Sequence, residues 1–309
     1  MLIGHQRILN FLKKSAENGR LAHAYLFAGP AHLGKKTVAL GFIKHLVGQE
    51  VKGKIIPDIL IIEPEVAEKD GVKKELEIGI DEARKIQHQM SLRPQVLPYK
   101  IALIDRAEKM TPEAGNCLLK TLEEPLGKTV MILITSNPKM LLPTIVSRCQ
   151  LVNFLPVAKS EIEKGLRSIG GNSPNIGRII RLANGRPGLA IEYLNNPELL
   201  KEEEKIIGQL KKILVSGINE RYRVAEEMSK NIPLTRQIIN RWLFWFRDLV
   251  LLKNNCPDLI TYPEAVQCQK SYSSAKLGEI IRAIKKSDWL LGNSGLNARL
   301  VLEVLMLEI

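Results

Sequence analysis

The chain has 309 residues, 45% of them hydrophobic, which is enough for about two domains with ordinary apolar cores. Its 45 lysines and arginines outnumber 33 aspartates and glutamates, and the net charge of +12 fits either a polyanionic partner such as nucleic acid or a lysine-rich solvated surface. No apolar run is long enough to cross a bilayer and the N-terminus lacks a signal-peptide pattern, so we expect a cytoplasmic protein without membrane contact.

The first half of the chain alternates helical segments with apolar strands. A glycine loop separates the first of these strands from the helix that follows it, and Lys69-Asp70-Gly71 predicts the tip of a hairpin. The predicted strands are 24–28, 58–62, 100–105, 130–135 and 150–154, and the predicted helices are 6–17, 35–47, 81–91 and 112–124. This alternation predicts an α/β fold with a doubly wound parallel sheet, which we end at residue 156.

The second half of the chain predicts helices without a convincing strand. Short helices at 160–168, 176–183 and 188–194 precede a region that is helical from 197 to the end. The final helix, 296–309, is apolar on most of its circumference, which is typical of a helix buried on several sides. Aromatic residues at helical spacing predict core packing rather than base stacking. They are Trp242, Trp245 and Phe246.

The segment Gly-Pro-Ala-His-Leu-Gly-Lys-Lys-Thr after the first strand predicts a phosphate-binding loop. A strand before it and a helix after it supply the context in which backbone N–H groups and a lysine face an anion. Gly29, Gly34 and Lys35 match the pattern G-x-x-x-x-G-K-[ST], but Lys36 stands where a hydroxyl should hold Mg²⁺. Thr37 carries a hydroxyl one residue late, about 100° further around the helix.

The strand that ends at Asp105 supplies a second part of the same site. In P-loop NTPases a carboxylate at this position helps to hold Mg²⁺, and the next residue is usually the glutamate that orients water. Here the next residue is Arg106, and only Glu108 is near enough in sequence to substitute. We therefore expect little or no ATP hydrolysis, no tightly bound cofactor, and at most weak binding of ATP, phosphate or sulfate at the loop.

The cysteines and histidines predict no metal site. The four cysteines form no Cys-x-x-Cys pair, and the five histidines are scattered. We accordingly expect no zinc, no other resident metal and no disulfide framework. The cysteines are Cys117, Cys149, Cys256 and Cys268.

Four blocks of sequence resemble the AAA+ clamp-loader subunits of bacterial DNA polymerase III. They are residues 23–30 (His-Ala-Tyr-Leu-Phe-Ala-Gly-Pro), 118–125 (Leu-Leu-Lys-Thr-Leu-Glu-Glu-Pro), 142–149 (Leu-Pro-Thr-Ile-Val-Ser-Arg-Cys) and 297–303. The resemblance implies an AAA+ domain over 1–156, a small helical lid over 157–196 and a helical collar over 197–309.

The resemblance also implies partners. The chain is expected in a pentamer with motor subunits and the delta subunit, bound to primer-template DNA through the complex and to the sliding clamp weakly or indirectly. Arg93 and Lys100 are implied to face DNA weakly. The family's metal-binding cysteines after the loop helix are absent between Leu46 and Ile62, which removes zinc.

Site residues follow from the same resemblance. Arg148 is implied to act as an arginine finger on a neighbouring subunit's ATP, while Ser147 and Cys149 shape the turn and pack beneath it. Ser136 and Asn137, after the strand 130–135, take the sensor-1-like position. Gly188 stands where the motor subunits carry a nucleotide-sensing lid arginine.

The leading hypothesis is a non-hydrolysing structural subunit of a clamp loader. An ATP-hydrolysing motor subunit that uses Thr37 and Glu108 as substitutes is the main alternative. A small-molecule P-loop kinase would leave the collar-like third of the chain unexplained. A stand-alone DNA-binding protein fits the charge but not the expected core position of the aromatic residues.

Overall fold

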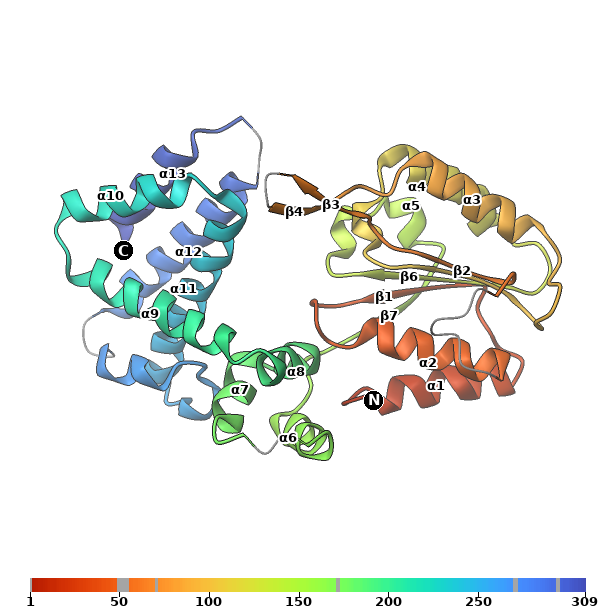
Figure 1. Cartoon of the computed structure of the whole chain (residues 1–309), viewed down its shortest axis with the longest axis horizontal. Coiled ribbons are helices and arrows are strands. Elements are labelled where there is room, and N and C mark those ends of the chain that lie inside the picture. The colour runs from red at the N-terminus through yellow and green to blue at the C-terminus, as the bar shows by residue number, and fades with distance from the viewer. Residues whose placement is uncertain (1, 49–55, 70–71, 171–172, 269–271, 293–294) are drawn as a thin grey trace. The chain divides into compact units, whose positions relative to one another are not determined.

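The computed structural model describes residues 2–48, 56–69, 72–170, 173–268, 272–292 and 295–309 (Figure 1). The chain divides into two compact units. The first comprises Met1–Gly171 and Gly185–Ile191, and the second comprises Asn172–Asn184 and Glu192–Ile309. Within the described residues, no helix is both long and apolar enough to span a membrane.

Strands and helices alternate along the first unit. Its elements are α1 (Gln6–Glu17), β1 (Ala24–Ala28), α2 (Lys35–Val47), β2 (Ile59–Ile62), β3 (Val66–Lys69), β4 (Val72–Glu75), α3 (Ile80–Ser91), β5 (Lys100–Ile104), the 3-10 turn η1 (Ala107–Lys109), α4 (Pro112–Glu123), β6 (Thr129–Thr135), η2 (Pro138–Met140), α5 (Pro143–Val146), β7 (Gln150–Asn153) and α6 (Lys159–Ser168).

The second unit is helical throughout its described part. Its elements are α7 (Ile176–Ala183), the part of α8 (Pro187–Asn195) from Glu192 onward, α9 (Glu198–Val215), α10 (Ile218–Ser229), α11 (Ile232–Lys253), η3 (Pro257–Leu259), η4 (Pro263–Cys268), α12 (Ser274–Leu291) and α13 (Ala298–Glu308). The division of the chain at residues 156 and 196 stays a prediction.

Five parallel strands form the central sheet in the order β2-β5-β6-β1-β7. Tyr25 and Phe27 of β1 belong to the core shared with α1 and α2, whereas Ala24 and Leu26 belong to the core shared with α3 and α4. Figure 1 shows these two helix pairs on opposite faces of the sheet. Because both faces are covered, the three central strands β1, β5 and β6 are buried along their whole length, and the predicted doubly wound parallel sheet is confirmed.

Local signals set the ends of the elements as the sequence predicted. The Thr111 hydroxyl accepts a hydrogen bond from the Ala114 N–H at 3.2 Å and caps α4, whose first residue is Pro112. Strands β3 and β4 pair in an antiparallel hairpin, which confirms that turn prediction. Asp70 and Gly71, the predicted tip, lie outside the described residues.

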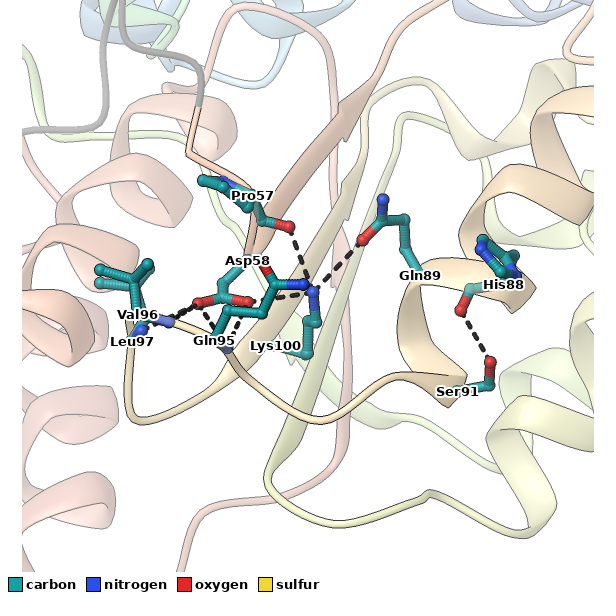
Figure 2. A network of polar contacts seen from close by, with 9 residues as sticks. All are labelled: Pro57, Asp58, His88, Gln89, Ser91, Gln95, Val96, Leu97 and Lys100. Carbon is teal, nitrogen blue, oxygen red and sulfur yellow. Dashed lines mark hydrogen bonds and ion pairs between the residues drawn. The ribbon is translucent and has the colours of Figure 1, made fainter.

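A buried ion pair joins β2 to β5 and corrects one expectation. The Lys100 side chain is only 2% exposed, and its Nζ lies 3.0 Å from Asp58 Oδ1. It also donates to the Pro57 carbonyl at 3.2 Å and to Gln89 Oε1 at 3.3 Å (Figure 2). The expectation that Lys100 faces DNA was therefore wrong, because the ammonium is enclosed by its own domain.

Asp58 is the acceptor at the centre of this network. Its carboxylate accepts hydrogen bonds from the backbone N–H groups of Gln95, Val96 and Leu97 at 2.7 to 3.1 Å (Figure 2). Burial alone would raise the pKa of Asp58, but these hydrogen bonds and the Lys100 ammonium hold that pKa well below its ordinary value. The network thereby fixes the segment between α3 and β5.

Aromatic side chains fill the core of the second unit. Trp242, Trp245 and Phe246 of α11 are at most 1% exposed, which confirms their predicted core position. Helix α13 differs from its prediction, because one face is buried and the other is not. Three side chains spaced along the open face are more than half exposed: Leu300, Val304 and Leu307.

We expect Asp58→Ala to lower the free energy of unfolding by about 3–5 kcal/mol at pH 7, because it leaves the Lys100 ammonium buried without its partner. Urea unfolding followed by circular dichroism measures this. Because the folded-state pKa of Asp58 is depressed, its stabilisation is present above about pH 4 and is lost as the pH falls, so the two proteins should converge in acid.

The matched control is Glu198→Ala, which removes an exposed ion pair with Lys201 and should leave the unfolding curve nearly unchanged. Equal, small effects of both substitutions would contradict the assignment of Asp58 as a buried structural acceptor.

Candidate functional site

Two glycines shape the loop between β1 and α2. Gly29 has a φ of 148°, and a Cβ at this position would lie 2.4 Å from the Phe154 carbonyl oxygen. Gly34 caps α2 with a φ of 84°, in the left-handed region. Both positions need glycine, one for close backbone approach and one for its backbone conformation. The loop backbone therefore depends on glycine at both positions that match the predicted pattern.

Lys35 lies within this loop, as the sequence predicted. Its side chain is buried, and Nζ donates to the carbonyl oxygens of Gly29 at 2.5 Å and Pro30 at 2.6 Å. Burial lowers the pKa of Lys35, while the nearby carboxylates of Glu108 and Asp105 oppose that shift. The ammonium therefore rests on the loop's own carbonyl groups.

Lys36 places a second ammonium beside two carboxylates. Its Nζ lies 2.6 Å from Glu63 Oε1 and 3.5 Å from Asp105 Oδ2. Glu63 follows the last residue of β2, and Asp105 follows the last residue of β5, the neighbouring strand. Burial raises the pKa of Asp105, and the charge of Lys36 acts against that rise. Glu63 was not predicted as a site residue, although its place directly after an apolar strand was a usable signal.

These residues do not fit a magnesium-bound nucleotide. The fold would place Mg²⁺ near Asp105 and the first turn of α2, where the Lys36 ammonium already lies. Thr37, the hydroxyl one residue further on, is exposed. Across the described ranges, no group of three or more His, Cys, Asp and Glu side chains could hold a metal ion.

The side chains of Arg106 and Glu108 contact other residues of their own domain. Arg106 has a φ of 54°, and its guanidinium pairs with the Glu75 carboxylate of β4. Glu108 accepts hydrogen bonds from the backbone N–H of Ser136, at 3.1 Å, and from its hydroxyl. Burial alone would raise the pKa of Glu108, but the hydrogen bonds of Ser136 outweigh it and the pKa is lowered. Glu108 is therefore an ionised structural acceptor.

Two further predicted positions lie on the same side of the domain. Ser136 contacts Glu108, whereas the Asn137 side chain accepts the Lys139 N–H at 3.3 Å and caps η2. The first residues of α8 contact the loop: the Gly188 N–H donates to the His32 carbonyl at 2.8 Å. A Cβ on Gly188 would lie 2.8 Å from that same oxygen, so no side chain fits there without displacing backbone.

Arg148 lies on the surface, two residues beyond the end of α5. Its Nη1 donates to the Thr144 carbonyl at 2.9 Å, and its Nη2 lies 2.5 Å from Glu123 Oε1 at the end of α4. The side chain remains 34% exposed. Glu123 was not predicted as its partner, although both residues fall in the sequence blocks that resemble the clamp-loader family.

Ser147 and Cys149, the two neighbours of Arg148, contact their own domain. The Ser147 hydroxyl donates to the Thr144 carbonyl at 3.1 Å. Cys149 packs against the core shared with α3 and α4, and burial raises the pKa of its thiol to about 12, so the thiol stays protonated at neutral pH. Arg93, the other predicted DNA-facing residue, is exposed after the end of α3.

Comparison with known proteins identifies the family. The family model for "DNA polymerase III, delta subunit" matches residues 4–158, half of the chain. The chain belongs to this family. Together with the parallel sheet and the helical remainder, this membership identifies an AAA+ domain followed by an all-α region, as the sequence predicted.

The curated relatives carry the same identification further. A DNA polymerase III subunit delta′ of Pseudomonas aeruginosa is 29% identical over 93% of this chain and 91% of its own length. The delta′ subunit of Bacillus subtilis is 32% identical over 65% of this chain, which matches only 62% of that protein's length. The predicted resemblance to the clamp-loader subunits of bacterial DNA polymerase III is thus confirmed, and both of these relatives are delta′ subunits.

A tau subunit of Bacillus subtilis is 26% identical over 88% of this chain and 53% of its own length. A gamma subunit-related protein of Thermotoga maritima, known from a crystal structure, has a TM-score of 0.49 at 21% identity, with 97% of both chains covered. This structural similarity is too low to support a conclusion about the fold beyond the observed sheet topology.

We expect Gly188→Ala to lower the free energy of unfolding by about 1–3 kcal/mol, because the new Cβ meets the His32 carbonyl. The control is Gly208→Ala within α9, where nothing lies within 4 Å of the added methyl. That substitution should raise the same free energy by about 0.5–1 kcal/mol through helix propensity. If both substitutions stabilise the protein in urea unfolding, the contact between α8 and the loop is not maintained in solution.

Proposed function

We propose that the chain is a non-hydrolysing subunit of a DNA polymerase III clamp loader and that Arg148 completes the ATP site of a neighbouring subunit. The observation that carries the first part is the Lys36 ammonium beside Glu63 and Asp105. Phosphoryl transfer in P-loop proteins depends on Mg²⁺ to neutralise the developing charge and on a residue that orients water. The chain has Lys36 at the position that would hold the metal and Arg106 at the position that would orient water.

A motor subunit is less well supported. It would need the Thr37 hydroxyl to hold Mg²⁺, yet Thr37 is exposed while Lys36 contacts Asp105. It would also need Glu108 as a base, yet Ser136 donates two hydrogen bonds to one oxygen of that carboxylate, and these bonds help to hold the pKa of Glu108 below its ordinary value. Both substitutes are thus engaged or displaced. No tightly bound cofactor is proposed, and binding of ATP or phosphate at the loop should be weak.

Arg148 is the residue that can act outside its own domain. Its guanidinium is planar, permanently charged and partly exposed, and the turn after α5 holds its backbone. A guanidinium fixed at an interface can stabilise charge on the phosphoryl group of a neighbouring site. The pair with Glu123 is partly solvent-exposed, so it contributes little to stability and serves better to orient the arginine.

The proposed partners are motor subunits and a delta subunit in a pentamer, with primer-template DNA and the sliding clamp reached through the complex. The exposed stripe of Leu300, Val304 and Leu307 on α13 supports a helical collar that packs against other subunits. Arg93 and the net charge of +12 support weak contact with DNA phosphates.

We expect the isolated chain to show no ATP turnover above background, because the metal position and the water-orienting position are both altered. A phosphate-release assay with purified protein measures this, with Lys35→Ala as the control for contaminating ATPase. Turnover by the unmodified chain that Lys35→Ala abolishes would contradict the proposal and favour the motor subunit.

In a loader reconstituted with intact motor subunits, we expect Arg148→Ala to leave assembly normal and to lower DNA-stimulated ATP hydrolysis at the adjoining site by about 10³-fold. Arg148→Lys should not restore the rate, because lysine lacks the planar fork. Single-turnover hydrolysis in the assembled complex, after gel filtration, provides the measurement.

Glu123→Ala is the matched control, because it removes the same ion pair and keeps the arginine. A finger predicts a much larger loss with Arg148→Ala than with Glu123→Ala. Equal effects of the two substitutions would mean that Arg148 serves only a local ion pair, and unchanged hydrolysis would reject the finger.

A further inference from the structure

The Lys36 side chain bridges two carboxylates that come from the ends of adjacent strands. Glu63 follows β2 and Asp105 follows β5, and the lysine reaches both from the second residue of α2. The ammonium is half-buried, and Asp105 is more enclosed than Glu63. An ordinary surface ion pair joins one cation to one anion, whereas this cation has two anionic neighbours at the carboxyl edge of the sheet.

The position of this lysine is electrostatically unfavourable without those neighbours. The N-terminal turn of a helix carries partial positive charge and favours acidic side chains. The first turn of α2 has no acidic residue, and its first two residues are Lys35 and Lys36. Glu63 and Asp105 supply the negative charge that the turn itself lacks. These two carboxylates balance the positive charge of the helix terminus and of Lys36 together.

We propose that Lys36 is a tethered counter-cation that occupies the divalent-cation position of this loop and excludes divalent metals from it. The inference deepens the proposed function, since it gives the reason for the loss of hydrolysis. A divalent cation near Asp105 would meet the lysine charge at close range and would find one coordinating oxygen of each carboxylate already paired. Without Lys36, Glu63 and Asp105 lose the cation that they share and present carboxylate oxygens of the kind that Mg²⁺ and Mn²⁺ prefer.

The test uses Mn²⁺ alone and the full chain without nucleotide. Free Mn²⁺ is followed by electron paramagnetic resonance during titration of the unmodified protein and of Lys36→Thr, which supplies a hydroxyl in place of the ammonium. We expect Lys36→Thr to bind one Mn²⁺ with a Kd at least about tenfold lower than that of the unmodified chain. Lys36→Gln, which removes only the charge, should show a smaller gain.

Two controls separate this site from a general change in charge. Lys14→Thr removes one exposed lysine from α1 and should bind Mn²⁺ as the unmodified chain does. Adding Asp105→Asn to Lys36→Thr should abolish the gained affinity. Far-ultraviolet circular dichroism verifies that each variant is folded.

The proposal is overturned if the unmodified chain binds one Mn²⁺ as tightly as Lys36→Thr does, or if neither folded Lys36 variant gains affinity. It is also overturned if the gain survives Asp105→Asn. None of these results would affect the role of Arg148, which is tested in the assembled loader, so failure of this inference is distinguishable from failure of the proposed function.

Discussion

The cation between Glu63 and Asp105 is the constraint on which the rest of the candidate site depends. A divalent metal would need a hydroxyl from α2 and open coordination positions on Asp105, whereas the Lys36 ammonium needs only the two carboxylates. The loop itself keeps its shape for a separate reason. Gly29 lies against the Phe154 backbone, so the loop is part of the packing between β1 and the end of β7. The geometry of the loop and its electrostatics therefore depend on different residues: Gly29 is needed for the backbone, and Lys36 places the charge beside Glu63 and Asp105.

The strands, the helices and the loop were predictable because their signals are local. Apolar runs such as Lys100–Ile104 are buried on both faces, and the cap at Thr111 depends on neighbouring residues alone. The partners of Lys36 and Lys100 were not predictable in the same way. Each contacts a carboxylate that directly follows or directly precedes β2, and that contact depends on β2 lying beside β5 in the sheet. Strand order is not written in any single segment.

The C-terminal helix illustrates a second limit of sequence patterns. An apolar circumference predicts that α13 is buried, but the pattern does not say whether the covering surface belongs to the same chain. Within the second unit, α10 and α12 pack on one side of α13, and Leu302, Leu305 and Met306 are buried there. The face with Leu300 and Val304 is open. A helix of this composition would be poorly soluble alone, so its sequence is better explained by assembly than by the fold of one chain.

Arg106 and Arg148, two arginines of the candidate site, have different environments, and this difference bears on their roles. Arg106 follows the Asp105 strand end but pairs with Glu75 of the hairpin, so its charge is used beside its own loop. Arg148 pairs with Glu123 at the end of α4, where the guanidinium stays partly open to solvent. An exposed pair costs little to break, and the carboxylate limits the rotamers of the arginine before a partner arrives. Under the proposed function, Lys36 stands at the metal position of this domain and Arg148 has no catalytic use at its own site, so a pre-oriented arginine at the surface would serve another chain.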